Sequence, residues 1–431
     1  MSSGSTKIII AGAGIAGPVL AMLLKARGYE PIVYERSKER TDAGLSLVLQ
    51  PNGLRILSEI PDFVQHIPGQ PIATMTSFST LNASPGLLHA SSLPSLLPKL
   101  LNLDHGLGML AVSRSKFHAY ILERAEAAGV EIQWGKRVVD VVQLENSTGT
   151  GKDAEAKVKV VFEDGTSDEA SWVIGCDGLH SGVRIALFGK EAADYTGVSQ
   201  TGGISPTPQA LAKLATMANF YGLGAHLIAY PISSTHTSWA LTIPEAELKE
   251  TWQAADKETQ EKIQSSSYAQ WNDGAGELIR TTEKLVKYGL FDRPELKTWH
   301  RGRVVLLGDA AHPTSPHLGQ GANQAFEDIS TLIRLLDADN TDRAPPSTLS
   351  LTAIFVEFER IRIPVSSEMV KGARERGESR VLGSEEKCKA RNEAIRQAGD
   401  SELSKVYSKI FGADEKFAEM LEALTTDQAE N

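Results

Sequence analysis

One stretch decides the fold of this chain: KIIIAGAGIAG, residues 7–17. Its first residues form an apolar, β-branched run that predicts a short buried strand. Gly12, Gly14 and Gly17 follow at the spacing of the dinucleotide-binding fingerprint. In that motif glycine permits a tight turn, lets the backbone approach a pyrophosphate, and packs a helix close to a strand. The alternative, that these glycines only mark a turn, is disfavoured by the elements on either side.

Those elements are a helix-forming run over residues 18–27 and a second apolar strand over residues 31–34. Strand, turn, helix and strand together predict a βαβ unit with a parallel sheet. Glu35, with Arg36 beside it, ends the second strand about 20 residues after the glycines, where a carboxylate accepts hydrogen bonds from ribose hydroxyls. A carboxylate there opposes a 2′-phosphate, so we expect FAD or NAD on this fold rather than NADP.

Composition bounds the remaining choices. The chain has 431 residues, 41% hydrophobic and 23% charged, which is typical of a globular protein with room for two domains. A net charge of −10 opposes binding to nucleic acid or anionic membranes. Two cysteines, Cys176 and Cys388, suit a reducing, cytoplasmic location. No run approaches the ~18 apolar residues of a membrane span, and either a monomer or a homodimer is expected.

The rest of the chain reads as alternating strands and helices, then a different texture. A helix is expected over residues 114–128, and strands over 131–134, 138–144, 158–162, 172–175 and 303–307. Residues 74–103 lose periodicity and read as a meandering excursion. Residues 188–295 read as a second domain with strands over 226–232 and 238–243 and a helical stretch over 245–264. A helix over 321–336 and a charged, helical C-terminal region complete the pattern.

A second glycine-rich segment follows the strand that ends at residue 307. Gly308 and Asp309 open it, and Gly319, Gly321, Ala322 and Asn323 then begin a helix. Backbone N–H groups at such a helix N-terminus point at a negative centre, such as the N1–C2=O edge of a reduced flavin. The Asp309 carboxylate suits a ribose or ribityl hydroxyl. This second segment therefore favours FAD over NAD.

With the motif GCDGLHSGVR at residues 175–184, three motifs stand in the order found in one family. The chain resembles the FAD-dependent monooxygenases of the para-hydroxybenzoate hydroxylase type over about its first 335 residues. The resemblance implies an α/β fold, with a Rossmann-like FAD-binding domain, an interleaved β-sheet substrate domain and a C-terminal helical region. The segments expected are 1–75, 114–187 and 296–340 for FAD, 76–113 and 188–295 for substrate, and 341–431 for the helical region.

The resemblance also assigns roles to residues. It implies that Glu35, Asp309 and Arg114 contact FAD, and that Asp177 and Arg184 serve both FAD and a transient nicotinamide; the plain alternative for Arg184 is a salt bridge. The family has no separate NAD domain, so NADH or NADPH is expected to reduce FAD and leave. O2 then gives a C4a-hydroperoxyflavin that hydroxylates a small aromatic such as a phenol or hydroxybenzoate, with or without decarboxylation.

Pro316 resembles the proline that lies against the flavin ring, and His317 resembles the histidine of salicylate- and 6-hydroxynicotinate-type decarboxylating hydroxylases. An imidazole there is suited to deprotonate a phenol, and the alternative is a hydrogen bond to the loop backbone. His226 and Tyr230 share one strand face and are expected either to line the substrate pocket or to belong to the core. His312 is expected to be structural.

Other possibilities stay open at this stage. Cys176 and His180 lack further ligands at suitable spacing, so no metal is expected. An epoxidase of an alkene or indole in secondary metabolism would keep the flavin and change the target. A flavoprotein that binds FAD without oxygenating anything, as a redox or interaction module, is a third possibility.

Overall fold

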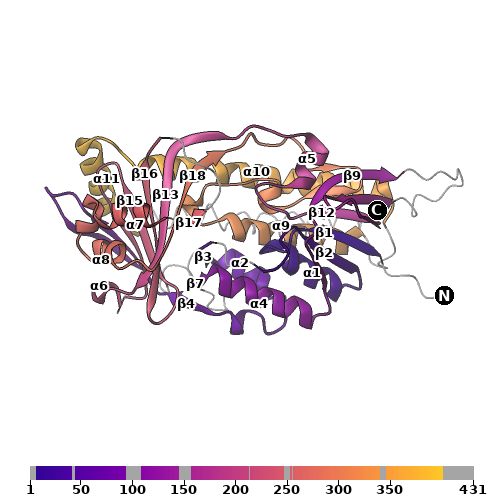
Figure 1. Cartoon of the computed structure of the whole chain (residues 1–431), viewed down its shortest axis with the longest axis horizontal. Helices are drawn as coiled ribbons and strands as arrows, with labels where there is room; N and C mark the ends of the chain where they lie inside the picture. Colours follow the sequence, from indigo (N-terminus) through magenta and orange to yellow (C-terminus); the bar gives the residue numbers. More distant parts are fainter. Residues whose placement is uncertain are drawn as a thin grey trace, which may run out of the picture.

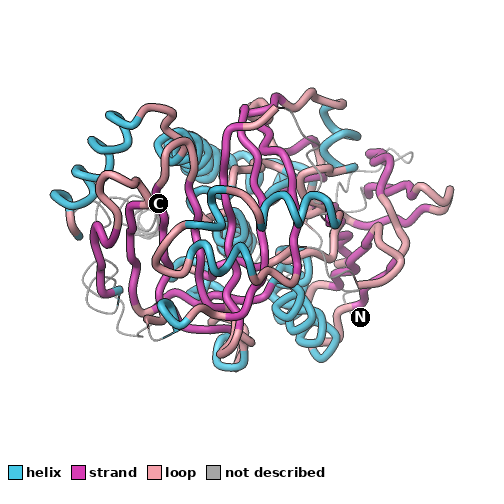
Figure 2. Tube along the Cα trace, turned by 60° about the vertical axis from the view of Figure 1, so that its left-hand side comes forward, coloured by secondary structure: helices cyan, strands magenta, loops and turns pink. Residues whose placement is uncertain are grey.

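Four β-sheets with flanking helices make up the described part of the chain in a computed structural model (Figure 1). Figure 2 shows long strands running through the middle of the molecule, with helices on either side. The structure describes residues 6–40, 44–93, 108–144, 157–212, 214–246, 253–254, 256–339 and 346–400. Residues 401–431, the end of the expected helical region, lie outside the described residues.

The first sheet contains the fingerprint strand at its centre. Its order is β19 (His300–Arg301), β20 (Val304–Leu306), β12 (Trp172–Gly175), β1 (Lys7–Ala11), β2 (Glu30–Glu35) and β8 (Glu131–Trp134). All neighbours pair in parallel except β19 with β20. Ile8, Ile9 and Ile10 are fully buried because helices and other strands cover both faces of a parallel sheet. Four apolar residues in a row therefore become the centre of the core.

Two small sheets extend this half of the molecule. The first is β11 (Ser167–Ala170), β10 (Lys157–Phe162) and β9 (Val138–Leu144), and the second is β3 (Ser46–Leu49), β7 (Met109–Ser113) and β4 (Gly69–Ile72). Both are antiparallel. The second sheet leads directly into α4 (Arg114–Ala127), so it sets the position of Arg114.

The large sheet has eight strands and two different faces. Its order is β17 (Gln253–Ala254), β18 (Lys284–Asp292), β13 (Asp194–Pro206), β16 (His236–Pro244), β15 (His226–Pro231), β14 (Thr216–Tyr221), β5 (Thr74–Ser79) and β6 (Gly86–Ser92). Along β14, Ala218 and Phe220 join a hydrophobic cluster with α8 (Ala275–Arg280). Met217, Asn219 and Tyr221 point the other way, into a cavity, because side chains alternate along a strand.

Helices cover the outer faces and the C-terminal end. The remaining ones are α1 (Ala16–Ala26), α2 (Pro51–Leu57), α5 (Gly182–Phe188), α6 (Gln209–Ala212), α7 (Lys257–Gln264), α9 (Gly321–Asp339), α10 (Thr348–Arg380) and α11 (Glu385–Ala398), with short 3₁₀ turns at η1 (Val64–His66), η3 (Ser267–Gln270), η4 (Gly308–Ala310) and η5 (Pro316–Leu318). Helix α10 runs along the top of Figure 1 between the parallel sheet and the eight-stranded sheet. It packs on α9 and η5, and its last turns reach the large sheet, where Arg376 donates to Tyr221 of β14.

Two segments differ from the sequence prediction. Residues 74–103 were expected to meander, but Thr74–Ser79 and Gly86–Ser92 are strands of the large sheet. Long-range parallel pairing with β14 orders a Ser- and Thr-rich segment whose own pattern is weak. Of the helix expected over 245–264, the described residues contain Lys257–Gln264, where Asp256 caps the helix by accepting from the Thr259 N–H at 2.8 Å. Gln253–Ala254 is a short strand instead, and residues 247–252 and 255 lie outside the described residues.

Candidate functional site

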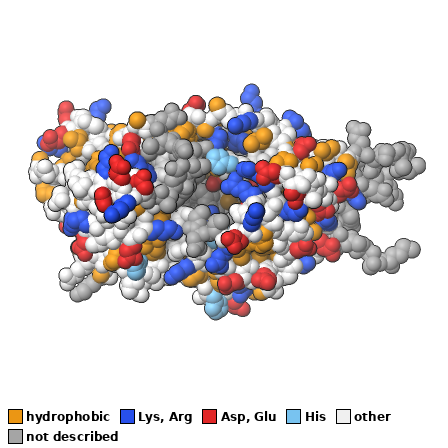
Figure 3. All heavy atoms as spheres, in the orientation of Figure 1, with side chains coloured by type: hydrophobic (Ala, Val, Ile, Leu, Met, Phe, Trp, Pro, Cys, Tyr) orange, Lys and Arg blue, Asp and Glu red, His pale blue; other side chains and the backbone are white. Residues whose placement is uncertain are grey.

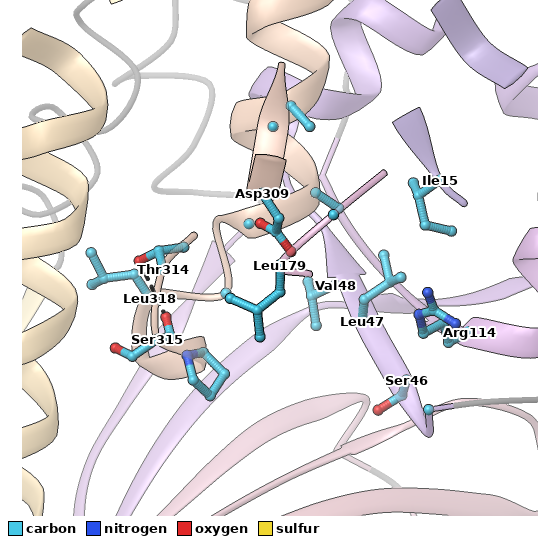
Figure 4. A pocket seen from close by; sticks show the side chains of 18 of the residues that line it. Ile15, Ser46, Leu47, Val48, Arg114, Leu179, Asp309, Thr314, Ser315 and Leu318 are labelled. Carbon is cyan, nitrogen blue, oxygen red and sulfur yellow. Dashed lines mark hydrogen bonds between the residues drawn. The ribbon is translucent and has the colours of Figure 1, made fainter. Parts of the chain in front are cut away.

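One cavity of about 1140 Å³ is lined by both the parallel sheet and the eight-stranded sheet. The fingerprint turn, Glu35 and Asp309 line one part of it, and the inner face of β14 and β15 lines another. Figure 4 shows Asp309 and Leu179 between Arg114 on one side and Thr314, Ser315 and Leu318 on the other. The cavity is therefore long enough to hold a dinucleotide and a small molecule end to end.

The three fingerprint glycines do three different things. Gly12 has φ +103°, and a Cβ there would lie 2.5 Å from the Cys176 carbonyl oxygen, so this residue must stay glycine for the turn to pack. A Cβ on Gly17 would overlap the Gly12 carbonyl oxygen, because α1 starts directly against the strand. A Cβ on Gly14 would meet nothing within 4 Å, and Gly14 lines the cavity. Only at Gly14 does the missing side chain leave room for a ligand.

The Glu35 carboxylate closes the turn. It accepts from the backbone N–H of Ala13 at 2.9 Å and of Ser37 at 2.9 Å, and it lines the cavity together with the exposed Arg36. His118 on α4 also contacts this turn, with its Nε2 donating to the Ala13 carbonyl oxygen at 2.6 Å. Burial lowers the pKa of His118, so the imidazole is neutral in this contact. The sequence analysis missed His118, because nothing local marks it.

Asp309 and Arg114 both line the cavity, and each affects the pKa of the other. Burial raises the pKa of Asp309, while His312 and Arg114 act in the opposite direction. Burial lowers the pKa of Arg114, which Asp309 partly offsets. Gly44, with φ +86°, allows the Arg114 side chain to pass, since a Cβ there would lie 2.5 Å from its Cδ. Both charges face the cavity, where a ligand's hydroxyls and carbonyls would meet them.

The residues of the cavity fit FAD. The open space at Gly14 suits a pyrophosphate, the Glu35 carboxylate suits a ribose, and Asp309 with Arg114 suits the ribityl chain and the flavin. The N-terminus of α9, a 19-residue helix, reaches the cavity at Gly321 and Ala322 after Gly308 and Gly319, which also line it. Its N–H groups would face the negative edge of a reduced flavin.

Several expected site residues do not line this cavity. Arg184 is 5% exposed, pairs with Glu191 and donates to the carbonyl oxygens of Ala311 at 3.4 Å and Pro294 at 3.3 Å. The Arg184 side chain lies outside the cavity wall and contacts the loop of residues 308–313 through the Ala311 carbonyl oxygen. Asp177, by contrast, lines the cavity; burial raises its pKa, and its carboxylate accepts from Ser181 and from the Val183 N–H at 3.1 Å.

Asn323 and His226 also lie outside the cavity wall, although both are buried. Asn323 accepts from the Gln50 N–H at 3.0 Å and donates to the carbonyl oxygens of Val48 and Gly319, each at 3.0 Å, so it ties β3 to the loop before α9. His226 shares a strand face with Tyr230 but is covered by Tyr221, whose ring centroid is 4.8 Å away. Burial, then Arg380, lowers the pKa of His226 well below its ordinary value.

Tyr230 does line the cavity, beside a chain of hydroxyls. Ser46 Oγ donates to Ser238 Oγ at 2.7 Å and lies 3.0 Å from Tyr230 Oη. Because Ser46 has one proton, Tyr230 donates to Ser46 and its oxygen keeps lone pairs for a ligand. Burial raises the pKa of Tyr230, so the hydroxyl stays protonated near neutral pH. Methionines form the neighbouring wall, namely Met75, Met109, Met217 and Met369.

Pro316 and His317 lie in η5, and both line the cavity. His317 is 5% exposed, and its Nδ1 lies 3.2 Å from Arg380 Nη1. Arginine can only donate, so Nδ1 accepts and the ring proton sits on Nε2. Nε2 packs against Gly377, where a Cβ would lie 2.7 Å from it. Burial, then Arg380 and Arg376, lowers the pKa of His317 to about 3.

A buried ionic network holds the loop that carries Asp309. Arg362 of α10 donates to Asp328 at 2.7 Å and to Glu327 at 2.8 Å. Asp328 also accepts from His312 Nε2 at 2.6 Å and from the Gly308 N–H at 2.9 Å. Burial would raise the pKa of Asp328, but His312 and Arg362 outweigh it and lower that pKa. His312 is thus a support of the loop.

The described ranges contain no cluster of three or more side chains that could hold a metal ion, and Cys176 and Cys388 form no disulfide. No helix there is long and apolar enough to cross a bilayer. Figure 3 shows acidic and basic side chains interspersed over one face, with hydrophobic ones scattered among them.

The chain is similar in sequence to proteins of known activity. Residues 5–353 match a family described as FAD binding domain. The chain is 30% identical to a 3-amino-4-hydroxybenzoate 2-monooxygenase of Streptomyces platensis over 88% of this chain and 89% of the relative. It is 29% identical to a 6-hydroxynicotinate 3-monooxygenase of Pseudomonas fluorescens over 78% of this chain and 83% of the relative.

Solved structures agree on the fold. HpxO of Klebsiella pneumoniae, determined with FAD and uric acid, superposes with a TM-score of 0.78 over 95% of this chain and 98% of its own, at 23% identity. A 2,6-dihydroxypyridine-3-hydroxylase of Arthrobacter nicotinovorans superposes with a TM-score of 0.71 over 89% of this chain and 94% of its own, at 21% identity.

Proposed function

The chain belongs to the FAD-binding family of flavoprotein monooxygenases, and from this membership we propose that it hydroxylates a small phenolic or hydroxybenzoate-like aromatic with NADH or NADPH and O2. One observation carries the proposal: a single cavity joins the dinucleotide turn to a wall of methionine and tyrosine side chains. The named activities of its relatives on aminohydroxybenzoate and hydroxynicotinate support the substrate class.

Different residues of the cavity would bind the cofactor and the substrate. When bound, FAD takes electrons from the nicotinamide and supplies one atom of O2 to the ring. Gly14, Glu35, Arg114 and Asp309 would hold it, and the N-terminus of α9 would stabilise negative charge on it. The Tyr230 oxygen would accept a hydrogen bond from a substrate hydroxyl. Methionine side chains would exclude water and adapt to the shape of a flat ring.

Product analysis tests this function. We expect FAD-loaded enzyme to consume NADH or NADPH faster when a phenol or hydroxybenzoate is present, and the product to gain one oxygen by mass spectrometry. Replacement of a carboxylate by hydroxyl would identify decarboxylative hydroxylation. Oxygen gain on an alkene or indole alone would instead assign an epoxidase. Nucleotide oxidation that yields only hydrogen peroxide with every compound would contradict the proposal.

We propose further that His317 acts as a neutral hydrogen-bonding residue rather than as a base. Its Nδ1 lone pair is engaged by Arg380, and its remaining nitrogen carries the proton. A pKa of about 3 also leaves it a weak base. The supported role is to hold the Arg380 guanidinium in place at the cavity wall.

The stability of the folded protein is expected to depend on pH through His317. The folded-state pKa of His317 is lowered from 6.5 to about 3, so below pH 6.5 the unfolded chain binds a proton that the folded chain does not. Stability is then lost as pH falls, by about 1.4 kcal/mol per pH unit from this one group. We expect His317→Gln to lose less stability than wild type between pH 6.5 and 5, measured by denaturant unfolding of FAD-loaded protein. The exposed His66→Gln is the control, and equal slopes for His317→Gln and wild type would contradict the assignment.

The proposed location of the enzyme is the cytoplasm. The proposed oligomeric state is a monomer or homodimer, and light scattering of the purified protein would measure it. The proposed domain division assigns the six-stranded sheet to the FAD domain and the eight-stranded sheet to the substrate domain.

A further inference from the structure

Three arginines of the C-terminal helices gather around one tyrosine of the large sheet. Arg376 of α10 donates to Tyr221 Oη at 3.5 Å, and Arg380 lies one turn later on the same helix. Arg391 of α11 stacks on the ring, with its guanidinium carbon 4.9 Å from the centroid. Arg376, Arg380 and Tyr221 line the cavity, whereas Arg391 packs on the Tyr221 ring and does not line the cavity.

The Arg380 cation is buried without an anion. It is 6% exposed, one of its donors goes to neutral His317, and its Nε has no hydrogen-bond partner among the described residues. In that same part of the chain, no carboxylate forms an ion pair with any of the three arginines. Burial, then Arg376, lowers the pKa of Arg380 to about 10, so it remains charged near neutral pH.

A buried, unpaired cation is costly to a folded protein. Arg380 is the last residue of α10, where the helix dipole favours positive charge, but a dipole does not satisfy the guanidinium N–H groups. Two carboxylates, Glu368 and Glu375, also line the cavity, yet both are exposed and neither pairs with Arg376 or Arg380. A ligand in the cavity could therefore supply the anion that the Arg380 guanidinium lacks.

We infer that Arg376, Arg380 and the Tyr221 hydroxyl form a binding site for an anionic oxygen group of the substrate, a carboxylate or a phenolate. The inference rests on the proposed function for the identity of the ligand as an aromatic. A planar guanidinium matches a carboxylate with two parallel hydrogen bonds, which fixes orientation as well as affinity. Since Arg380 also contacts His317, an anion bound there lies beside the 316–318 loop and sets which ring edge faces it.

Binding to FAD-loaded enzyme without nicotinamide tests the site independently of turnover. The probes are benzoate, salicylate, 4-hydroxybenzoate and 6-hydroxynicotinate, each against its uncharged amide, and 4-nitrophenol above and below its ionisation. Kd is read from changes in flavin absorbance. We expect wild type to bind at least one carboxylate or phenolate about tenfold or more tightly than its neutral counterpart. Carboxylate preference alone would identify the carboxylate as the group bound, and phenolate preference alone the phenolate.

The variants Arg380→Gln and Arg376→Gln are expected to bind the charged and neutral members of each pair alike. Arg374→Gln, exposed on the same helix and outside the cavity wall, is the matched control and should keep the preference. If wild type prefers no anion in the panel, or if Arg380→Gln keeps the preference, the inference is overturned. A failure of the proposed function would look different, as normal anion binding without an oxygenated product.

Stability gives a second readout that needs no ligand. If Arg380 is kept for binding, Arg380→Met should unfold at the same temperature as FAD-loaded wild type or higher, because removing an unpaired buried charge relieves its cost. A fall of several degrees with unchanged anion preference would show that Arg380 serves the fold instead.

Discussion

A Gly14→Val variant is expected to fold normally and lose FAD, whereas Gly17→Val is expected not to fold. A Cβ on Gly14 meets no protein atom within 4 Å, so the new side chain enters only the space left for a pyrophosphate. We expect FAD affinity to fall at least about 100-fold, equivalent to about 2.8 kcal/mol. The measurements are FAD titration by fluorescence and thermal unfolding of apoprotein, in which Gly14→Val should match wild-type apoprotein.

Gly17→Val is the matched comparison, because it adds the same atoms three residues later. There the Cβ would overlap the Gly12 carbonyl oxygen, so helix α1 would have to move off the parallel sheet. A cost of about 4 kcal/mol or more is expected from overpacking at this position. Retention of FAD by Gly14→Val would remove the pyrophosphate from this turn, and a stable Gly17→Val would refute the packing argument.

Arg362→Met is expected to destabilise the enzyme by about 3–5 kcal/mol, because it leaves two buried carboxylates without their cation. Arg362 is 3% exposed and bonds both Asp328 and Glu327. Asp328 in turn holds the Gly308 N–H, so the turn that presents Asp309 should loosen and FAD should bind more weakly. Denaturant unfolding and FAD titration would measure the two effects.

Arg360→Met on the same helix provides the control, since Arg360 pairs with Glu357 at the surface and its loss should cost less than about 1 kcal/mol. A triple variant of Arg362→Met with Asp328→Asn and Glu327→Gln should recover part of the lost stability, because the uncompensated charges are gone. Equal stability of Arg362→Met and Arg360→Met would show that the network contributes little.

The elements around the fingerprint could be predicted from sequence, because their signals are local. The four apolar residues before Gly12 form the buried part of β1, and Gly28, with φ +84°, follows α1 as expected for a helix C-terminus. The family, the fold class and the FAD cofactor follow from three such motifs in order. Residues 7–35 therefore carry most of what the sequence alone shows about the nucleotide half.

The arginine cluster of the cavity could not be found in this way, although Tyr230, which also lines the cavity, was among the expected pocket residues. Tyr221, Arg376 and Arg380 are brought together by packing of α10 and α11 on the large sheet, across more than a hundred residues of sequence. Local spacing offers no sign of that, and a charged helical stretch ordinarily predicts a solvated face. His317 shows the same limit, because its neighbour Arg380 decides its protonation and lies 63 positions away.

Helix α10 begins at Thr348, within the stretch shared with the family, and continues well past residue 353, where that match ends. Its first half is anchored by Arg362 to the flavin loop, and its last two turns present Arg376 and Arg380 to the substrate. One helix thus supports the loop that presents Asp309 with its first half and the proposed anion site with its last turns.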